Sequence, residues 1–360
     1  MTDFLVIGGG IAGLSAGARL APHGHVTLLE TEAALGYHTS GRSAALYEET
    51  YGLPSTVALN RASKSFFLQD NPHLVTERGL LLVAGPADGA AFAHDVTTLE
   101  MTPLTLAEAR AILPILNPDT VTQAAHHPAA WDIDTDALLQ SHARTIRAHG
   151  GKVMTGQQVT AIRRRGAGWS VTTAAGDIDA RMVVNAAGAW ADAVAALAGL
   201  PPLGITPLRR SMARIPAPEG HDTRAWPMTM GAGETWYMKP DAGALIVSPA
   251  EEDPSHPHDA WADDMVLAEG LARYEHHVTT PVTRLIGSWA GLRSFAPDRQ
   301  LVLGPDPLAP SFLWSSGQGG YGFQTSPAAS ALVADLATGR PPALDPATVA
   351  ALSPARFRQM

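Results

Sequence analysis

Short apolar runs alternate with glycine-rich and polar segments along the chain, most clearly in its first thirty residues. Residues 4–7 form an uninterrupted apolar run, as expected of a strand that is covered on both faces. Residues 12–20 then place small and apolar side chains at helical spacing, and residues 25–30 predict a second strand that ends in Glu30. A strand, a helix and a strand in this order predict the βαβ unit of a parallel sheet.

The turn between the first strand and the helix has the glycine spacing of a dinucleotide-binding site. Gly8, Gly10 and Gly13 allow a tight turn and let the backbone approach a pyrophosphate, which the helix N-terminus would bind. Glu30 ends the second strand, twenty residues after Gly10, where an acid suits the ribose hydroxyls. The acid disfavours a 2′-phosphate, so NADP is not expected. This fingerprint alone does not separate NAD from FAD.

Two later segments favour FAD. Residues 181–192 contain an apolar strand that ends in small residues and a glycine, a pattern common in flavoproteins. Residues 317–336 predict a glycine-rich loop and a helix, with Thr325 or Ser326 as the N-cap and Pro327 in the first turn. A helix N-terminus aimed at the flavin pyrimidine edge would stabilise negative charge there. An ordinary capped helix is the alternative.

Composition narrows the class of protein. The chain has 360 residues, of which 46% are hydrophobic and 16% charged, enough for two domains with substantial cores. The net charge of −9 and the lack of a long basic run make nucleic acid an unexpected partner. The apolar runs are too short for a transmembrane segment and no signal-peptide pattern is present, so we expect a cytoplasmic protein. The lack of cysteine excludes disulfides, thiolate nucleophiles and iron–sulfur clusters.

Seven motifs occur in an order that is informative in combination: GYHTSGRSAALY, DIDTDALLQ, VVNAAGAWAD, PLRRSMA, WYMKPDAG, WAGLRSFAPD and QGGYGFQTS. Together they resemble the D-amino-acid oxidase superfamily of FAD enzymes. Within it, the chain most resembles the bacterial FAD-dependent D-amino acid dehydrogenases of the D-arginine type, over nearly its whole length. The resemblance implies non-covalent FAD and hydride transfer from Cα to flavin N5. The imino acid formed would hydrolyse to a 2-oxo acid and ammonia.

The resemblance extends the expected cofactor contacts beyond the fingerprint. It brings Arg42, Ser43 and Ala44 to FAD, although an ion pair at the surface is the alternative for Arg42. His38 lies in the same loop, where we expect no covalent link to FAD. The full set of expected cofactor contacts is Gly8, Gly10, Ile11, Ala12, Gly13, Glu30, Arg42, Ser43, Ala44, Val159, Ala187, Gly188, Gly291, Gly319, Gly320, Tyr321, Gly322, Phe323, Gln324 and Thr325.

A D-amino acid has a carboxylate, an amine and a Cα–H, and the chain carries candidates to bind it. The planar guanidinium of arginine binds a carboxylate through two hydrogen bonds, and the resemblance assigns this role to Arg293 and Arg210. It also places the hydroxyls of Tyr237 and Tyr51 at the substrate, with the Tyr51 loop as a lid, while Gly320 leaves space. We assign no catalytic base, because none is required if the amine binds neutral. Structural ion pairs and packing are the alternatives for these side chains.

Two departures from the resemblance concern substrate choice. Relatives that accept basic D-amino acids have an acid where this chain has Gly79, and Leu46 replaces a polar residue. Both changes predict a more apolar pocket and a preference for neutral or hydrophobic side chains. Glu48, Glu49 or Glu77 could supply a carboxylate instead, so this alternative stays open.

We expect no metal site. Asp132, Asp134 and Asp136 have EF-hand spacing, but the loop lacks the required glycine and closing glutamate. Asp134 or Thr135 is instead expected to cap a helix. The histidine pairs show no HExxH spacing and are expected to be solvated.

The expected architecture is an α/β fold with two discontinuous domains. A Rossmann-like FAD-binding domain would comprise residues 1–47, 133–205 and 287–360. An α+β substrate-binding domain with a mixed sheet would comprise 48–132 and 206–286, and the site would lie between the domains.

Several functions compete. The favoured one is FAD-dependent oxidation of D-amino acids, with a glycine- or sarcosine-type amine oxidase as the first alternative. A non-catalytic dinucleotide-binding protein and a NAD-dependent dehydrogenase are further alternatives. Arg210, Tyr237 and Arg293 argue against a mere dinucleotide binder. The electron acceptor stays open between a quinone, another carrier and oxygen.

Overall fold

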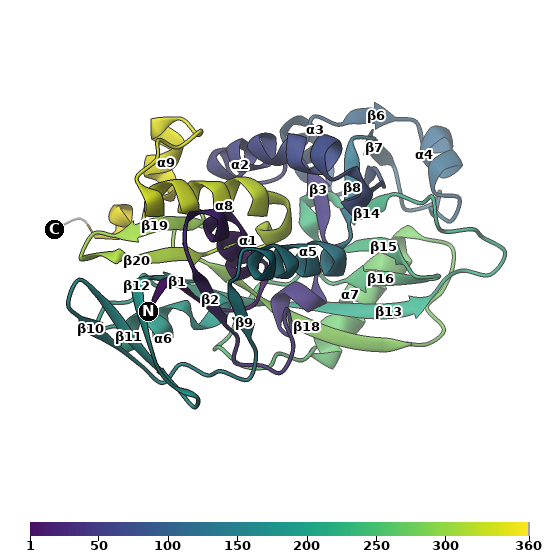
Figure 1. Ribbon diagram of the computed structural model, residues 1–360. Helices are drawn as coiled ribbons and strands as arrows, with labels where there is room; N and C mark the ends of the chain where they lie inside the picture. The colour runs from purple at the N-terminus through teal and green to yellow at the C-terminus, as the bar shows by residue number, and fades with distance from the viewer. Residues whose placement is uncertain (359–360) are drawn as a thin grey trace.

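The computed structural model describes residues 1–358, whose strands form an eight-stranded sheet, a nine-stranded sheet and a three-stranded sheet. Figure 1 shows the two large sheets beside each other, with most helices packed on their faces. The α/β fold class predicted from the sequence is confirmed. The chain passes back and forth between the sheets, so each is built from segments that are distant in sequence.

The eight-stranded sheet contains the predicted βαβ unit. Strand β1 (Thr2–Ile7) pairs in parallel with β2 (Val26–Leu29), and α1 (Ile11–Leu20) connects them. The sheet order is β10-β11-β12-β1-β2-β9, and β20 pairs with the end of β12 and with β19. These strands are β9 (Lys152–Met154), β10 (Ala161–Arg165), β11 (Gly168–Thr173), β12 (Gly176–Asn185), β19 (Val302–Asp306) and β20 (Ala309–Ser316).

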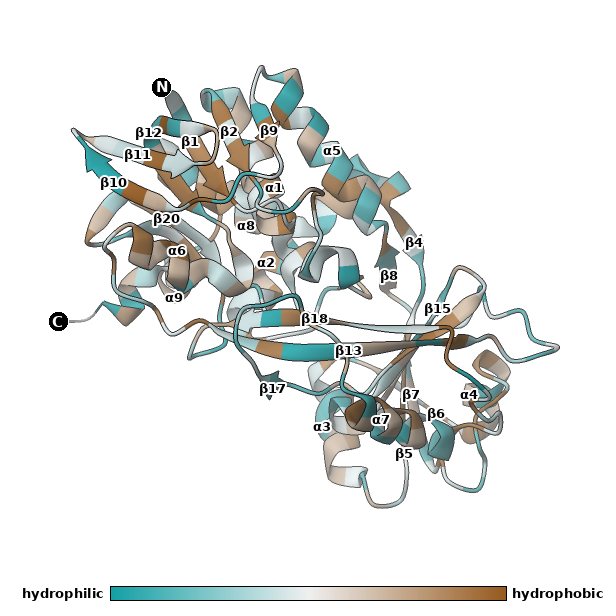
Figure 2. Ribbon diagram, turned by 90° about the horizontal axis from the view of Figure 1, so that it is seen from below, coloured by the Kyte–Doolittle hydropathy of each residue, from teal (hydrophilic) through white to brown (hydrophobic). Residues whose placement is uncertain are grey.

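Side chains of β1 alternate between two buried layers, which explains its unbroken apolar sequence. Phe4 and Val6 join a core with α1, α5 (Thr135–Ala148) and α8 (Gly322–Thr338). Leu5 and Ile7 join the core on the opposite face, beneath β10, β11 and α6 (Ala191–Leu197). Figure 2 shows the apolar character of β1 and β2, as expected for parallel strands covered on both faces.

The nine-stranded sheet is mixed, as predicted. Its order is β17-β13-β16-β15-β14-β5-β7-β6, with β18 on the other side of β13, and only β14 and β5 pair in parallel. The helices associated with it are α3 (Gly89–Thr98), α4 (Leu106–Ile112) and α7 (Asp264–His277). The strands are β5 (Leu80–Ala84), β6 (Thr102–Leu104), β7 (Gln123–His127), β13 (Thr206–Pro216), β14 (Met228–Gly231), β15 (Tyr237–Asp241), β16 (Ala244–Ser248), β17 (Asp253–Pro254) and β18 (Gly287–Phe295).

Two predicted domain boundaries do not coincide with the sheets. Residues 287–295, expected in the FAD-binding part, form β18, which pairs with β13 along nine residues of the nine-stranded sheet. Helix α2 (Pro54–Ser65), expected in the substrate part, places Leu59 in the same core as α8. A sequence window does not show these long-range contacts, because the pairing partners lie far away along the chain.

A three-stranded sheet, β3-β8-β4, joins the two halves. Its strands are β3 (Leu46–Glu48), β8 (Ala130–Ile133) and β4 (Val75–Glu77). The predicted cap at the start of α5 is confirmed, because the Asp134 side chain accepts a hydrogen bond from the Ala137 N–H at 2.9 Å. Asp132 instead binds Arg78 and Lys239, each within 2.7 Å. The remaining helix, α9 (Pro346–Leu352), lies close to the C-terminal end.

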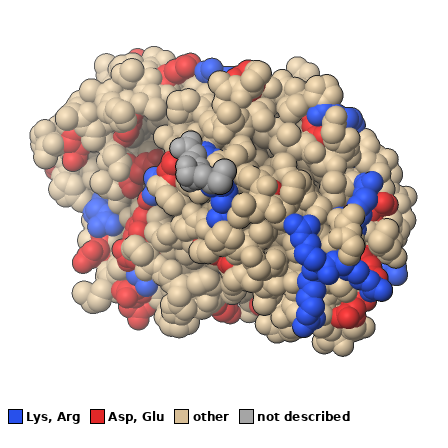
Figure 3. All heavy atoms as spheres, turned by 90° about the vertical axis from the view of Figure 1, so that its left-hand side faces the viewer, with Lys and Arg blue, Asp and Glu red and all other residues tan. Residues whose placement is uncertain are grey.

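The surface carries charges of both signs. Figure 3 views the side with the β10–β11 hairpin and the C-terminal region, where arginines gather at one edge beside acidic side chains. On strands β10 and β12, Arg165 lies 2.7 Å from Asp179, and Arg181 lies 3.9 Å from Asp3. No helix among residues 1–358 is long and apolar enough to cross a membrane.

Candidate active site

A deep cavity lies between the two large sheets and brings together most of the predicted site residues. All five predicted substrate residues line it: Tyr51, Arg210, Tyr237, Arg293 and Gly320. The predicted cofactor residues that also line it are Gly10, Ile11, Ala12, Arg42, Ser43, Ala44, Gly188, Gly291, Gly319, Gly322, Phe323 and Gln324. Those outside the lining are Gly8, Gly13, Glu30, Val159, Ala187, Tyr321 and Thr325.

The glycine-rich turn requires its glycines for close packing. A Cβ on Gly8, whose φ is 113°, would lie 2.3 Å from the Ala186 carbonyl oxygen. A Cβ on Gly13 would lie 1.9 Å from the carbonyl oxygen of Gly8. These glycines therefore shape the turn from behind the cavity, while Gly10 faces it. Helix α1 begins after Gly10 without a side-chain cap, which leaves a helix N-terminus suited to an anion.

Glu30 lies beside this turn. Its carboxylate accepts hydrogen bonds from the Gly9 N–H at 2.6 Å and from the Glu32 N–H at 2.9 Å. Both bonds fix the acid at the end of β2, next to the start of α1. Val159 lies farther away and packs on the core that contains Leu29.

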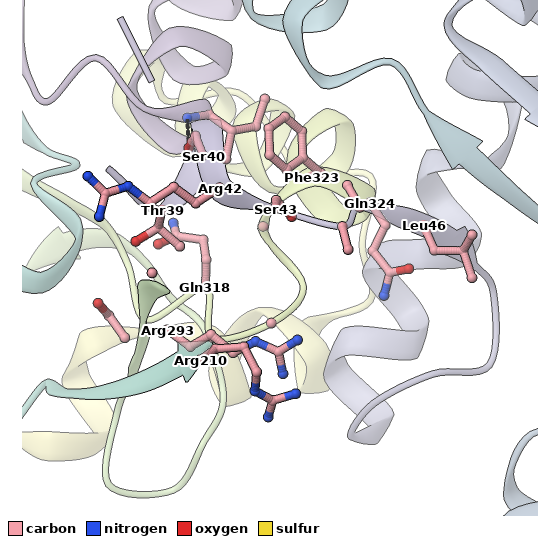
Figure 4. A pocket seen from close by; sticks show the side chains of 18 of the residues that line it. Thr39, Ser40, Arg42, Ser43, Leu46, Arg210, Arg293, Gln318, Phe323 and Gln324 are labelled. Atoms are coloured by element: carbon pink, nitrogen blue, oxygen red, sulfur yellow. Dashed lines mark hydrogen bonds between the residues drawn. The ribbon is translucent and has the colours of Figure 1, made fainter. Parts of the chain in front are cut away.

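The loop over residues 36–45 forms one wall of the cavity. The Ser40 hydroxyl accepts a hydrogen bond from the Ile11 N–H at 3.0 Å, which ties the loop to the start of α1 (Figure 4). Thr39 donates to the Leu292 carbonyl at 2.7 Å, which ties the same loop to β18. The loop therefore bridges the two large sheets.

Arg42 lines the cavity, and its guanidinium makes the ion pair that was the alternative to a cofactor contact. It donates to the Ala260 and Ala290 carbonyls at 2.8 Å, to the Tyr37 carbonyl at 3.3 Å, and to Asp259. Through these hydrogen bonds the guanidinium ties the loop to β18, at Ala290, and to the segment that contains Asp259 and Ala260. Only the stem and backbone of Arg42 are left for a cofactor. Figure 4 shows the guanidinium at the end of the cavity opposite Leu46.

His38 is held by polar and aromatic neighbours. Its Nε2 lies 3.0 Å from Glu32, and its ring centre lies 4.7 Å from that of Trp190. It lines a separate small cavity behind the loop. Among residues 1–358, no group of three or more His, Asp or Glu side chains is arranged to hold a metal ion.

Helix α8 reaches the cavity with its first turn. It begins at Gly322 after an N-cap, Tyr321, that makes no side-chain cap, so the predicted capping by Thr325 or Ser326 is wrong. Pro327 lies inside the helix and has no N–H for the Phe323 carbonyl. The Ser326 hydroxyl replaces that donor at 2.9 Å. The helix can therefore start one turn earlier than the sequence pattern suggested.

Gln324 lies in this first turn and is 3% exposed. Its Oε1 accepts a hydrogen bond from the Glu48 N–H at 3.1 Å, while its Nε2 is buried without a partner among the described residues. A buried donor without a partner is costly, so this group calls for an acceptor in the cavity.

Arg293 extends into the cavity from β18. No hydrogen bond or ion pair to another described residue holds its guanidinium. Burial lowers its pKa, but the neighbouring Tyr237, Tyr51 and Glu234 together outweigh burial and raise it, so the group stays charged. A charged guanidinium without a protein partner is suited to an anionic ligand.

Arg210 lies next to Arg293 (Figure 4), but its guanidinium is already engaged. It donates to the Glu251 carbonyl at 2.9 Å and to the Glu252 carboxylate at 3.3 Å. Arg299 shares Glu252 at 2.7 Å. Arg210 is therefore a weaker candidate than Arg293 for direct binding of an anion.

Tyr51 and Tyr237 approach the arginines from two elements. Burial and the nearby Glu234 raise the pKa of Tyr51 well above its usual value, so its hydroxyl keeps its proton. Tyr237 projects from β15 beneath Arg210, 5.9 Å from ring centre to guanidinium carbon. The Tyr51 hydroxyl can therefore donate a hydrogen bond in the cavity. The Tyr237 hydroxyl donates to the Met212 sulfur at 3.5 Å, a weak acceptor that a ligand oxygen could replace.

The sequence reading missed several residues of the lining. Glu234 adopts a φ of 55°, which is uncommon for a residue other than glycine and occurs often at functional sites. Its carboxylate lies near Tyr51, Arg293 and Tyr321, and no motif in the sequence pointed to it. Met228 and Met230 alternate along β14, which is a strand pattern that could have revealed them. Further missed residues of the lining are Thr39, Ser40, Ala45, Leu80, Ala186, Met212, Leu292, Ser294 and Gln318.

Gly79, predicted to stand where relatives that accept basic substrates have an acid, does not reach the cavity. Gly79 has a φ of 72° and does not line the cavity, and a Cβ there would lie 2.9 Å from Nε2 of His126. Leu80 lines the cavity instead, together with Leu46 and Glu48. The wall is apolar here, as expected, but a carboxyl group is present beside it.

Comparison with known proteins identifies the family. Residues 3–336 match the family model described as FAD dependent oxidoreductase (DAO). The chain belongs to this family. It is 24% identical to glycine oxidase of Geobacillus kaustophilus, over 95% of this chain and 94% of the relative. It is 25% identical to glycine oxidase of Pseudomonas putida, over 96% and 97%.

Solved structures of the same fold agree with the family assignment. Glycine oxidase from Geobacillus kaustophilus superposes with a TM-score of 0.83 at 23% identity, covering 97% of both chains. L-Proline dehydrogenase from P. horikoshii superposes with a TM-score of 0.85 at 22% identity, covering 99% of this chain and 98% of that one. The predicted superfamily and the FAD cofactor are therefore confirmed, while the narrower D-arginine dehydrogenase type stays a prediction.

The residues present fit FAD. The start of α1, where the N-cap residue Gly10 makes no side-chain cap, can receive a pyrophosphate, and Glu30 stands where the ribose acid of this family is expected. The buried Nε2 of Gln324 lacks a partner at the first turn of α8, where a flavin carbonyl would supply one. The chain is an FAD-dependent oxidoreductase, and Arg293, Tyr51 and Tyr237 line its cavity.

Proposed function

We propose that this enzyme oxidatively deaminates D-amino acids with neutral or hydrophobic side chains to 2-oxo acids and ammonia. The observation that carries the proposal is Arg293, a half-buried, charged guanidinium in the cavity lining that has no partner among the described residues. A substrate carboxylate would supply the missing partner through two hydrogen bonds. A protein that only binds a dinucleotide has no need of this charge.

The cavity residues would bind and orient the substrate. Arg293 holds its carboxylate, and the hydroxyls of Tyr51 and Tyr237 donate hydrogen bonds beside it. Bound FAD would accept the hydride from Cα at flavin N5, which leaves an imino acid for hydrolysis. No protein base is assigned, because an amine that binds neutral needs none.

The side-chain end of the cavity supports the substrate preference. Leu46, Leu80, Met212, Met228 and Met230 contribute apolar surface to it. Methionine side chains adapt to ligands of different shape. A cationic side chain would have to be desolvated against this wall, so D-Arg and D-Lys are expected to be poorer substrates than apolar D-amino acids.

A glycine- or sarcosine-type amine oxidase is the second candidate. It is favoured by the two glycine oxidases that match over nearly the whole chain. Both candidates use Arg293 in the same way, and they differ in whether the space between Met230 and Leu80 holds a substrate side chain.

Product analysis separates the candidates. Purified enzyme with an artificial electron acceptor is incubated with D-Met, L-Met, glycine and sarcosine, and the 2-oxo acid and ammonia are measured. Product from D-Met far above that from the other three supports the proposal. Glyoxylate from glycine or sarcosine, without product from D-Met, would establish the second candidate. A parallel measurement of hydrogen peroxide in air shows whether oxygen, rather than a quinone or another carrier, accepts the electrons.

A further inference from the structure

Glu48 is a buried carboxyl group that the proposed chemistry does not use. It is 2% exposed, and it lines the cavity from β3. Side chains two residues apart on a strand point to the same face, so Glu48 follows Leu46 into the cavity while Tyr47 enters the core behind. Its place in the lining is a consequence of the short strand β3.

Only one oxygen of this carboxyl group is satisfied. Oε1 accepts hydrogen bonds from Thr50, at 3.1 Å from the backbone N–H and at 2.8 Å from the hydroxyl. His127 on β7 lies 3.6 Å from the same oxygen. Oε2 is buried and has no partner among the described residues. A buried polar atom without a partner in a ligand cavity indicates a ligand group that completes it.

The sheet order places Glu48 at the side-chain end of the cavity. Arg293 on β18 and Arg210 on β13 lie at one end of the nine-stranded sheet. The strands then follow in the order β16, β15, β14, β5 and β7, so Tyr237, Met230 and Leu80 lie successively farther from the arginines. Leu80 is paired with His127, the neighbour of Glu48. A substrate whose carboxylate binds Arg293 therefore extends its side chain toward Glu48.

We infer that Glu48 selects substrates whose uncharged side chain ends in a hydrogen-bond donor, such as a carboxamide or a urea group. The stem of such a side chain would lie against Met228, Met230 and Leu80, and its N–H would donate to Oε2 of Glu48. This inference rests on the proposed function and narrows it from neutral side chains in general to donor-bearing ones. Burial raises the pKa of Glu48, which agrees with an uncharged partner.

The test compares substrates of similar size with and without the donor. The ratio of kcat/KM for D-Gln, and for the longer D-citrulline, to that for D-Met is measured in the wild type and in Glu48→Met and Glu48→Gln. Of these two kcat/KM ratios, we expect the one that is higher in the wild type to fall at least about tenfold in Glu48→Met. Glu48→Gln keeps an acceptor oxygen, so its ratio should stay within about threefold of the wild type. Glu49→Met is the matched control, because Glu49 pairs with Lys64 at 2.7 Å and does not line the cavity.

Each outcome decides the inference. If the kcat/KM ratios of Glu48→Met equal those of the wild type, the inference is overturned. Oxidation of D-Met in the same experiment would still support the proposed function. A wild type that prefers D-Lys to D-Gln, and loses this preference in Glu48→Gln, would show that Glu48 binds a cation instead, which also overturns it. If Glu48→Met does not fold, a wild-type ratio far below one for both donor-bearing substrates contradicts the inference. A wild type that oxidises no D-amino acid overturns the inference and the proposed function together.

Discussion

Gly320 lies directly against Arg293, and a Cβ on Gly320 would come within 2.9 Å of the guanidinium carbon. The Arg293 guanidinium can therefore occupy this position only because residue 320 has no side chain. At this contact the loop after β20, which carries Gly320, packs against β18, which carries Arg293. The carboxylate site depends on backbone close to Arg293 as much as on Arg293 itself.

Replacement of Gly320 by alanine should displace the guanidinium without unfolding the protein, because the clash is with the flexible end of a side chain. We expect kcat/KM for a D-amino acid to fall about tenfold or more, since small misplacements of a binding group are costly. Gly287→Ala is the control, because Gly287 lies on the same strand as Arg293 and has open space around it. Unchanged kinetics in Gly320→Ala would contradict the placement of the substrate carboxylate.

Arg293→Met should remove the main anchor of the substrate. Loss of one member of a buried, hydrogen-bonded charge pair costs about 2–5 kcal/mol, so kcat/KM should fall at least about 30-fold. Steady-state kinetics with D-Met measure the change. Arg214→Met serves as the control, because Arg214 lies on β13 and pairs with Asp241 at 3.5 Å, away from the cavity. Equal losses in both variants would mean that a general change in charge, rather than carboxylate binding, explains the effect.

Arg42→Ala should weaken the hold on FAD. The guanidinium links the loop that carries Ser40 to the Ala260 and Ala290 carbonyls and to Asp259. Without it we expect the Kd for FAD to rise about tenfold, measured by titration of the apoprotein, while KM for the substrate changes less than threefold. Arg61→Ala, on an exposed helix face, is the control. An unchanged Kd would show that the loop is held by Ser40 and Thr39 alone.

His142 should make the fold sensitive to acid. Burial lowers its pKa to about 4, with a further contribution from Arg19, and its Nε2 is buried without a partner among the described residues. The unfolded chain binds a proton near pH 6.5 and the folded chain only near pH 4, so stability is lost as the pH falls through this window. Denaturant titrations at pH 6.5 and 4.5 measure the free energy of unfolding. Between these pH values His142→Leu should lose about 2 kcal/mol less of it than the wild type. Equal losses would mean that other groups cause the acid sensitivity.

Local patterns in the sequence predicted the first βαβ unit well. The apolar run before Gly8, the helix after Gly10 and the strand before Glu30 are each set by neighbours along the chain. The same reading failed at α8, because the Ser326 hydroxyl allows Pro327 to lie inside the helix. A hydroxyl that donates in place of a missing backbone N–H does not alter the hydrophobic periodicity of the sequence, so the pattern could not reveal it.

The candidate site was only partly predictable. The resemblance pointed to Arg293, Tyr237 and Tyr51, and the structure brings these three residues to one cavity. The partners of Arg42 were not predictable, because Asp259 lies 217 residues away along the chain. Glu48 was one of three possible acids, and only the folded structure shows that it, and not Glu49 or Glu77, lines the cavity.

The central claim is that a D-amino acid reduces FAD bound in this cavity. The most direct test records the visible spectrum of the purified protein without oxygen, before and after addition of D-Met, L-Met, glycine or sarcosine. The proposal predicts an oxidised flavin band that disappears with D-Met and persists with the other three. A band that persists with D-Met and disappears only with glycine or sarcosine would contradict the proposed substrate, and a protein that cannot bind FAD would contradict the assignment of the cofactor.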